Sequence, residues 1–141
     1  MGKVIVKDVI LKNHRDEIAV DLGVRSADQI RQMKQDMIAD SGALAVGLPQ
    51  SLIDELGLPF LSEAESTLAN GTKVPVKVYE DLTVIIDDRI ARTQCLAKPE
   101  TAPLLLGQLV FEQIDYVIDC RNQKLIPNPN AQPGVMLFDD Y

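Results

Sequence analysis

The chain of 141 residues has one histidine and two cysteines, so most of the usual catalytic groups are missing. A zinc site built from several histidines is excluded, and a serine or cysteine nucleophile would have His14 as its only imidazole base. His14 lies in a polar segment, Asn13-His14-Arg15-Asp16, that is typical of a solvated helix start. The GxGxxG, GxxxxGK[ST] and CxxC motifs are also absent. Carboxylates remain as candidate catalytic groups, and we expect no metal and no cofactor.

Basic charge and long apolar runs are scarce as well. A net charge of −7 and a pI near 4.6 argue against nucleic acid or an anionic membrane surface as a partner. No apolar stretch approaches the roughly 18 to 20 residues of a membrane span. Met1-Gly2-Lys3 leads directly into the strand-like Val4-Ile5-Val6, without the pattern of a signal peptide. We therefore expect a soluble, cytoplasmic protein in which Cys95 and Cys120 are free thiols.

The apolar residues are mostly aliphatic, and there is no tryptophan. A hydrophobic content of 46% in a chain of this length predicts one compact domain with a real core. We assign this domain to residues 1–128, with a helical surface excursion at 13–31 and a tail rich in proline and asparagine at 129–141.

Short runs of valine and isoleucine, separated by turn residues, predict strands. The expected strands are 3–11, 32–39, 82–86, 90–96, 104–106, 115–119 and 124–126, and the expected short helices are 13–22, 50–57 and 108–113. A further hairpin is expected at 66–78, with Asn70-Gly71 at the centre of a type I′ turn. Many short strands with two or three short helices indicate a mainly β, barrel-like fold.

Several motifs follow one another in a fixed order. An apolar strand leads into the first motif, and a helix follows the start of the second. The fourth motif is an apolar run that ends in glycine and precedes another helix. The motifs are Asp40-Ser41-Gly42-Ala43, Leu48-Pro49 with 53–58, Leu68-Ala69-Asn70-Gly71, Leu104-Leu105-Leu106-Gly107 and Val117-Ile118-Asp119. Asp-Ser-Gly alone occurs often by chance, whereas the ordered set is more specific. Over residues 35–128 it resembles the retropepsin-like family of aspartic peptidases, in particular its small bacterial members.

The resemblance implies an acid-protease half-barrel that functions as a homodimer and hydrolyses an extended peptide or protein substrate. It implies a role for each motif. The implied catalytic residue is Asp40, supported in its turn by Ser41, Gly42 and Ala43. The implied flap is Ala69, Asn70, Gly71 and Thr72, and the implied buttressing strand is Leu105, Leu106 and Gly107.

The chemistry of such a site can be stated independently. Two carboxylates about 3 Å apart cannot both ionise, so one acts as base and the other as acid on a water molecule. The chain has no second Asp-[Ser/Thr]-Gly, so we expect Asp40 of a second copy to supply the partner. Gly42 allows a tight turn in which an N–H donates to the aspartate. Ala43 cannot donate a side-chain hydrogen bond to it, which favours a working range at less acidic pH.

Two alternatives remain open at this point. The same fold without activity would be a dimeric module that binds an extended peptide by strand addition. Alternatively, Asp40-Ser41-Gly42 is an ordinary β-turn in an unrelated small barrel. Ala39 is smaller than the residue usual before the aspartate in the family, which leaves the aim of the carboxylate open.

Overall fold

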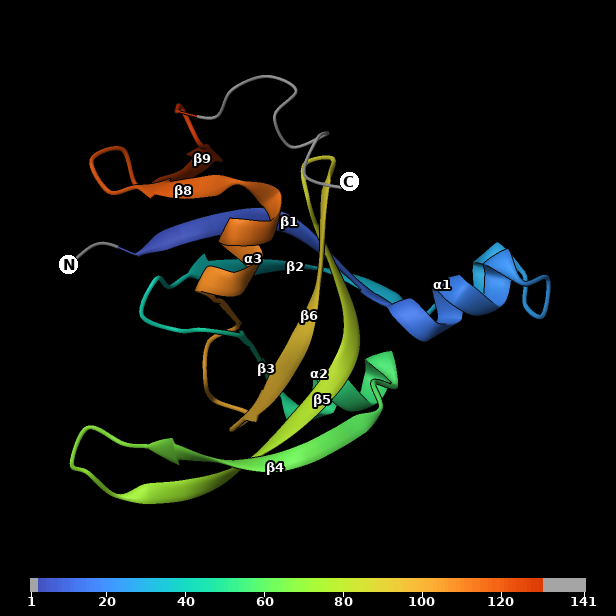
Figure 1. The fold of residues 1–141 in the computed structure, drawn as a ribbon, viewed down its shortest axis with the longest axis horizontal. Coiled ribbons are helices and arrows are strands. Elements are labelled where there is room, and N and C mark those ends of the chain that lie inside the picture. The colour runs from blue at the N-terminus through green and yellow to red at the C-terminus, as the bar shows by residue number, and fades with distance from the viewer. Residues whose placement is uncertain (1–2, 131–141) are drawn as a thin grey trace, which may run out of the picture.

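The computed structural model describes residues 3–130, and they form a mainly β protein with three α-helices (Figure 1). The strands are β1 (Val4–Asn13), β2 (Gln32–Ala39), β3 (Val46–Pro49), β4 (Phe60–Thr67), β5 (Lys73–Ile86), β6 (Arg89–Lys98), β7 (Leu105–Leu106), β8 (Tyr116–Asp119) and β9 (Lys124–Pro127). The helices are α1 (His14–Asp21), α2 (Gln50–Leu56) and α3 (Gln108–Ile114), with a 3₁₀ turn, η1, at Ala27–Gln29.

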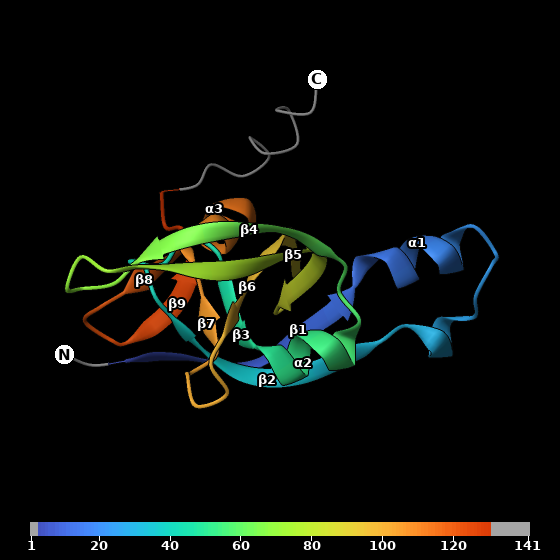
Figure 2. The same ribbon diagram turned by 90° about the horizontal axis from the view of Figure 1, so that it is seen from below.

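Seven strands form one sheet in the order β1-β2-β7-β3-β6-β5-β4. Because β1 also pairs with β5, the sheet is partly closed into a ring, and β4 lies outside that ring (Figure 2). β8 and β9 form a separate two-stranded sheet. Alternate residues of the ring strands point inward and make the core with α2 and α3. Fully buried members include Val9, Leu11, Val46, Leu48, Ile53, Leu56, Leu82, Val84, Cys95, Leu106 and Val110.

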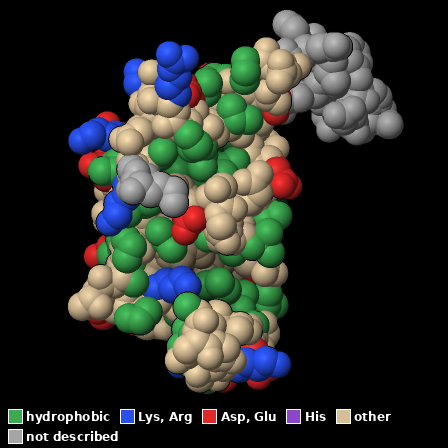
Figure 3. All heavy atoms as spheres, turned by 90° about the vertical axis from the view of Figure 1, so that its left-hand side faces the viewer, with side chains coloured by type: hydrophobic (Ala, Val, Ile, Leu, Met, Phe, Trp, Pro, Cys, Tyr) green, Lys and Arg blue, Asp and Glu red, His purple; other side chains and the backbone are tan. Residues whose placement is uncertain are grey.

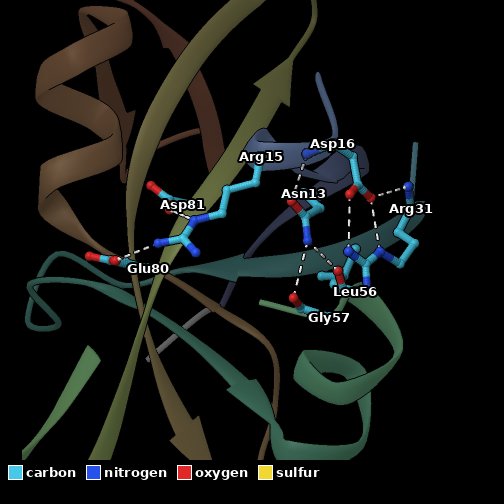
Figure 4. A network of polar contacts seen from close by, with 8 residues as sticks. All are labelled: Asn13, Arg15, Asp16, Arg31, Leu56, Gly57, Glu80 and Asp81. Carbon is cyan, nitrogen blue, oxygen red and sulfur yellow. Dashed lines mark hydrogen bonds and ion pairs between the residues drawn. The ribbon is translucent and has the colours of Figure 1, made fainter. Parts of the chain in front are cut away.

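The excursion between β1 and β2 projects from the body as α1 and η1 (Figures 1 and 2). Asn13 caps α1 as expected, since its side chain accepts a hydrogen bond from the Asp16 N–H at 3.0 Å. The Asp16 carboxylate is almost completely buried and accepts from Nε, a terminal nitrogen and the backbone N–H of Arg31 (Figure 4). The Arg31 hydrogen bond holds the pKa of Asp16 below its ordinary value.

The same network ties the base of the excursion to the end of α2 (Figure 4). The Asn13 Nδ2 donates to the carbonyl oxygens of Leu56 at 2.9 Å and Gly57 at 3.1 Å. Gly57 ends α2 in the left-handed region at φ 65°, and a Cβ there would collide with the Arg31 guanidinium. The left-handed backbone conformation favours glycine at 57, and a side chain there would also displace the Arg31 guanidinium.

The hairpin between β4 and β5 differs from the expected one. A type I′ turn would pair Ala69 with Thr72, whereas the Leu68 N–H donates to the Thr72 carbonyl at 2.7 Å. The loop has three residues, and only Gly71 has positive φ, at 84°. The type I′ prediction is wrong, because Asn-Gly also suits a type I turn followed by one left-handed glycine. The hairpin is also longer than predicted, since β5 runs without interruption from Lys73 to Ile86.

Cys95 is buried, Cys120 is exposed, and both are free thiols, as expected. In the part of the chain that the structure describes, no helix is long and apolar enough to cross a membrane. Residues 131–141 of the predicted tail at 129–141 lie outside the residues that the structure describes.

Candidate functional site

Asp40 is positioned by the parallel pairing of β2 with β7. The register places Ile38 opposite Leu105 and Ala39 opposite Leu106. The Asp40 N–H donates to the Leu106 carbonyl at 2.9 Å, one residue beyond the end of β2 at Ala39. Asp40 is therefore tied at its backbone to a strand more than 60 residues later in the chain.

The turn after Asp40 is closed by hydrogen bonds to the aspartate itself. The Ala43 N–H donates to the Asp40 carbonyl at 3.1 Å, and the Gly42 N–H donates to Asp40 Oδ1 at 2.9 Å. A Cβ on Gly42 would lie 3.2 Å from Oδ1. Within residues 3–130, neither Oδ2 of Asp40 nor the Ser41 hydroxyl forms a hydrogen bond. One carboxylate oxygen is thus held by the turn, and the other is available to an external group.

The segment after β7 crosses directly against the segment after the turn. A Cβ on Gly107 would lie 2.5 Å from the carbonyl carbon and oxygen of Leu44 and closer still to the Ala45 oxygen. The first residues of α3 continue the contact, since the Gln108 N–H donates to the Ala43 carbonyl at 2.8 Å. Only glycine fits at 107, because the crossing leaves no space for a side chain.

A cavity of about 320 Å³ opens beside Asp40. Its lining residues come from the turn, the start of β1 and the β8–β9 hairpin, and they are Val4, Ala39, Asp40, Ser41, Ile118, Cys120 and Gln123. Sequence patterns had not assigned Val4, Cys120 or Gln123 to the site. They reach it only through long-range packing, and no local motif marks them.

The tip of the β4–β5 hairpin holds Ala69, Asn70, Gly71 and Thr72, all exposed. It lies on the same side of the molecule as the Asp40 turn and the β8–β9 hairpin, at the left of Figure 1. No hydrogen bond joins the hairpin tip to the turn within the described residues. The structure therefore brings the turn and the residues at 105–107 into contact and leaves the tip apart from both.

The face that carries the turn is rich in hydrophobic side chains (Figure 3). Large apolar residues are exposed in three different segments. Leu44 beside the turn is 66% exposed, Leu68 at the hairpin is 46% exposed, and Val117 in β8 is 37% exposed. Leu44 lies closest to Asp40 in the chain and is the most exposed of the three.

His14 lies away from this site. Its Nδ1 accepts a hydrogen bond from Arg92 Nε at 3.1 Å, in a separate pocket between α1, β5 and β6. Among residues 3–130, no three His, Cys, Asp or Glu side chains gather as a metal site. The carboxylate of Asp40 is the chemically relevant group of the candidate site.

Comparison of the sequence with models of protein families and with curated proteins finds no match.

Proposed function

We propose that the protein is an aspartic endopeptidase with a retropepsin-like fold, in which two identical chains each contribute Asp40. The two carboxylates share one proton and activate a water molecule that attacks the carbonyl of a peptide bond. No covalent intermediate is involved in this chemistry.

The crossing at Gly107 supports this proposal more than any other observation. It links an Asp-Ser-Gly turn to an apolar strand far along the chain through the bonds from Asp40 to Leu106 and from Gln108 to Ala43. An ordinary surface turn does not need a glycine packed against its backbone from a distant strand. The crossing holds the backbone of the turn in place, and a catalytic carboxylate must be held in a fixed geometry.

The need for a second copy follows from the number of carboxylates. Among residues 3–130, Asp40 is the only acidic residue that lines the 320 Å³ cavity, so the second carboxylate of the proposed site would come from a second copy. The exposed side chain of Leu44, which follows the turn, offers apolar surface to a partner. A two-fold axis near Ser41 would place the two Asp40 carboxylates side by side.

The β4–β5 hairpin fits the role of a cover over the substrate. In β5, Val74 and Val76 are partly buried and lie on the same face as the buried Val78, whereas Lys73 and Lys77 are exposed on the other face. The face that continues into the core is therefore apolar. Such a face suits an extended peptide whose apolar side chains are shielded from water.

Cleavage of a denatured peptide mixture tests the proposal. The wild type, Asp40→Asn and the exposed-turn control Asp88→Asn are incubated from acidic to neutral pH, and new termini are identified by mass spectrometry. We expect cleavage by the wild type and by Asp88→Asn, and none by Asp40→Asn.

The outcomes separate the alternatives. Equal, negligible cleavage by all three proteins, with peptide still bound, would indicate the inactive peptide-binding module. A strictly monomeric mass at high protein concentration would leave Asp40 without a second carboxylate and would contradict the proposal.

A further inference from the structure

The arm, residues 14–31, projects between β1 and β2 and has no apolar core of its own. Of its residues, only Asp16 is buried. The bonds that tie the arm to the body are polar, among them the Asp16–Arg31 ion pair and the hydrogen bonds from Asn13 to the end of α2. In a single chain, therefore, none of the apolar side chains of the arm is buried.

The tip of the arm, residues 21–25, holds two strongly exposed apolar side chains. Leu22 is 73% exposed and Val24 is 74% exposed, the highest values for large apolar residues in the part of the chain that the structure describes. Removing such surface from water is favourable by about 25 cal/mol per Å². Exposure alone does not identify a partner, but the charges beside these two side chains do.

Backbone hydrogen bonds hold the tip in one conformation. The Gly23 N–H donates to the Val20 carbonyl at 3.0 Å. The Val24 N–H donates to the Ala19 carbonyl at 2.9 Å. Gly23 has a φ of 76°, and a Cβ there would meet no atom within 4 Å. Another chain can therefore approach the backbone at Gly23, and binding requires little ordering of the tip.

Asp21 and Arg25 carry opposite charges at the two ends of the tip. Within residues 3–130, neither lies within 4.0 Å of a side chain of opposite charge. Arg31 is the main cause of the lowered pKa of Asp16 and Arg25 contributes least, so this carboxylate does not neutralise Arg25. The other charged side chains of the arm have partners: His14 with Arg92, Arg15 with Glu80 and Asp81, Asp16 with Arg31, Glu17 with Thr83, and Asp28 with Ser26.

The sequence of the tip is complementary to itself about Gly23. An apolar residue lies on each side of the glycine, followed by a negative charge at one end and a positive charge at the other. In a two-fold contact between identical surfaces, residue i of one copy meets residue j of the other, and j meets i. An axis beside Gly23 would place Leu22 against Val24 and, twice over, Asp21 against Arg25.

The net charge of the arm also suits a second copy. Its three arginines and four carboxylates nearly balance, whereas the whole chain carries −7. Because the arm projects from the body, two tips can meet while the bodies stay apart (Figures 1 and 2). Repulsion between two acidic bodies falls with their separation and is screened by salt.

We propose that the tip of the arm binds the same tip of a second copy of this chain across a two-fold axis. Leu22 and Val24 of the two copies form the apolar centre of the contact, and the two ion pairs between Asp21 and Arg25 form its rim. A contact of this small size is transient. It is separate from the proposed pairing at Asp40 and does not depend on peptidase activity.

NMR of amide and methyl groups at increasing protein concentration tests the proposal. Between about 20 µM and about 1 mM, we expect the Gly23 amide and the methyl signals of Leu22 and Val24 to shift. The exposed Ile90 in β6 is the internal control and should not shift. Tip signals that do not depend on concentration, or that shift together with Ile90, overturn the proposal. The first outcome would mean that a second copy does not occupy the tip.

Charge reversal tests the pairing of the two ends. Asp21→Arg and Arg25→Asp each place like charges opposite one another in a pair of identical chains, so we expect the association constant at the tip to fall about tenfold in each. An equal mixture of the two variants regains both ion pairs and should associate within about twofold of wild type. Asp88→Arg, in the exposed β5–β6 turn, changes the net charge as Asp21→Arg does and should leave association unchanged.

The mixture separates self-pairing from other causes. Recovery would also show that both variants are folded, whereas no recovery would overturn the self-complementary contact. The double variant Leu22→Gln, Val24→Thr keeps both charges and removes the apolar centre, so we expect the concentration-dependent shift of the Gly23 amide to be lost. A shift as large as in wild type would contradict the role of the apolar pair.

Discussion

The backbone N–H of Asp40 donates to the carbonyl oxygen of Leu106 at 2.9 Å, which joins the Asp-Ser-Gly turn to a two-residue strand late in the chain. The bond is sheltered, because Ala39 and Leu106 are both buried. A hydrogen bond between buried backbone groups cannot be replaced by water at low cost. The position of Asp40 is therefore tied to the core and does not depend on the exposed turn alone.

Gly107→Ala should destabilise the fold and the site together. Its Cβ would lie 2.5 Å from the carbonyl group of Leu44, and backbone atoms cannot move aside as a flexible side chain can. We expect the free energy of unfolding to fall by about 3 kcal/mol and peptide cleavage to be lost. Urea denaturation and the cleavage assay measure the two effects.

Gly47→Ala is the matched control for this substitution, because Gly47 lies in β3 opposite Leu105. A Cβ at 47 would lie 3.1 and 3.2 Å from Cε and Cγ of the flexible Lys98 side chain and at an ordinary contact distance of 3.7 Å from Cβ of Leu105. We expect a change below about 1 kcal/mol and retained cleavage. Equal losses of stability and cleavage in Gly107→Ala and Gly47→Ala would show that the close crossing at Gly107 is not the cause.

Mixing wild-type chains with Asp40→Asn chains should reduce the cleavage activity per wild-type chain if the two carboxylates of one site come from two different chains. After exchange in an equal mixture, about one dimer in four is wild type, so activity per wild-type chain falls to about half. The measurement is cleavage rate at a fixed amount of wild type, with Asp88→Asn as the added chain in the control. A rate unaffected by the added Asp40→Asn would mean that each chain acts alone.

The sequence predicted the local features of the fold well. Asn13 as the cap of α1 and Gly57 as the end of α2 depend on residues adjacent in the chain, so local chemistry is sufficient to identify them. The strand before Asp40 and the apolar pair before Gly107 were also evident from short patterns. In these segments, local preference and the final fold agree.

The remaining features depend on pairing between distant residues. Nothing local indicates that β1 pairs with β5 to close the ring, and Val4 and Cys120 reach the cavity beside Asp40 only as a result of the tertiary arrangement. The turn type predicted at Asn70-Gly71 was wrong for a related reason. Both hairpin turns accept this dipeptide, and the register of the long strands β4 and β5 decides between them.

Asp16→Asn should destabilise the protein in a pH-dependent way. The variant loses the charge that accepts three hydrogen bonds from Arg31, and we expect a loss of about 2 kcal/mol at neutral pH. The hydrogen bond from Arg31 lowers the pKa of Asp16 below its ordinary value of 3.8 in the folded state. The ionised Asp16 therefore contributes fully to stability at pH values above its ordinary pKa. This contribution is lost as pH falls through the lower pKa of the folded state.

Urea denaturation over a range of pH measures this dependence. The difference between wild type and Asp16→Asn should be constant above about pH 5 and should shrink at pH values below 3.8. Asp21→Asn, at the exposed end of α1, is the matched control and should change stability by less than about 0.5 kcal/mol. A difference that persists unchanged into strong acid would show that the charge of Asp16 is not responsible.

Thiol labelling should distinguish the two cysteines and report on the cavity beside Asp40. Burial raises the pKa of Cys95 to about 12, so hardly any thiolate is present at pH 8, whereas Cys120 is exposed. An aromatic disulfide reagent should therefore modify Cys120 rapidly in the folded protein and Cys95 only after unfolding. Because Cys120 lines the same cavity as Asp40 and Ser41, its modification should also reduce cleavage. Cys120→Ser is the control and should be active and insensitive to the reagent; a labelled wild type with undiminished activity would place the cavity outside the functional site.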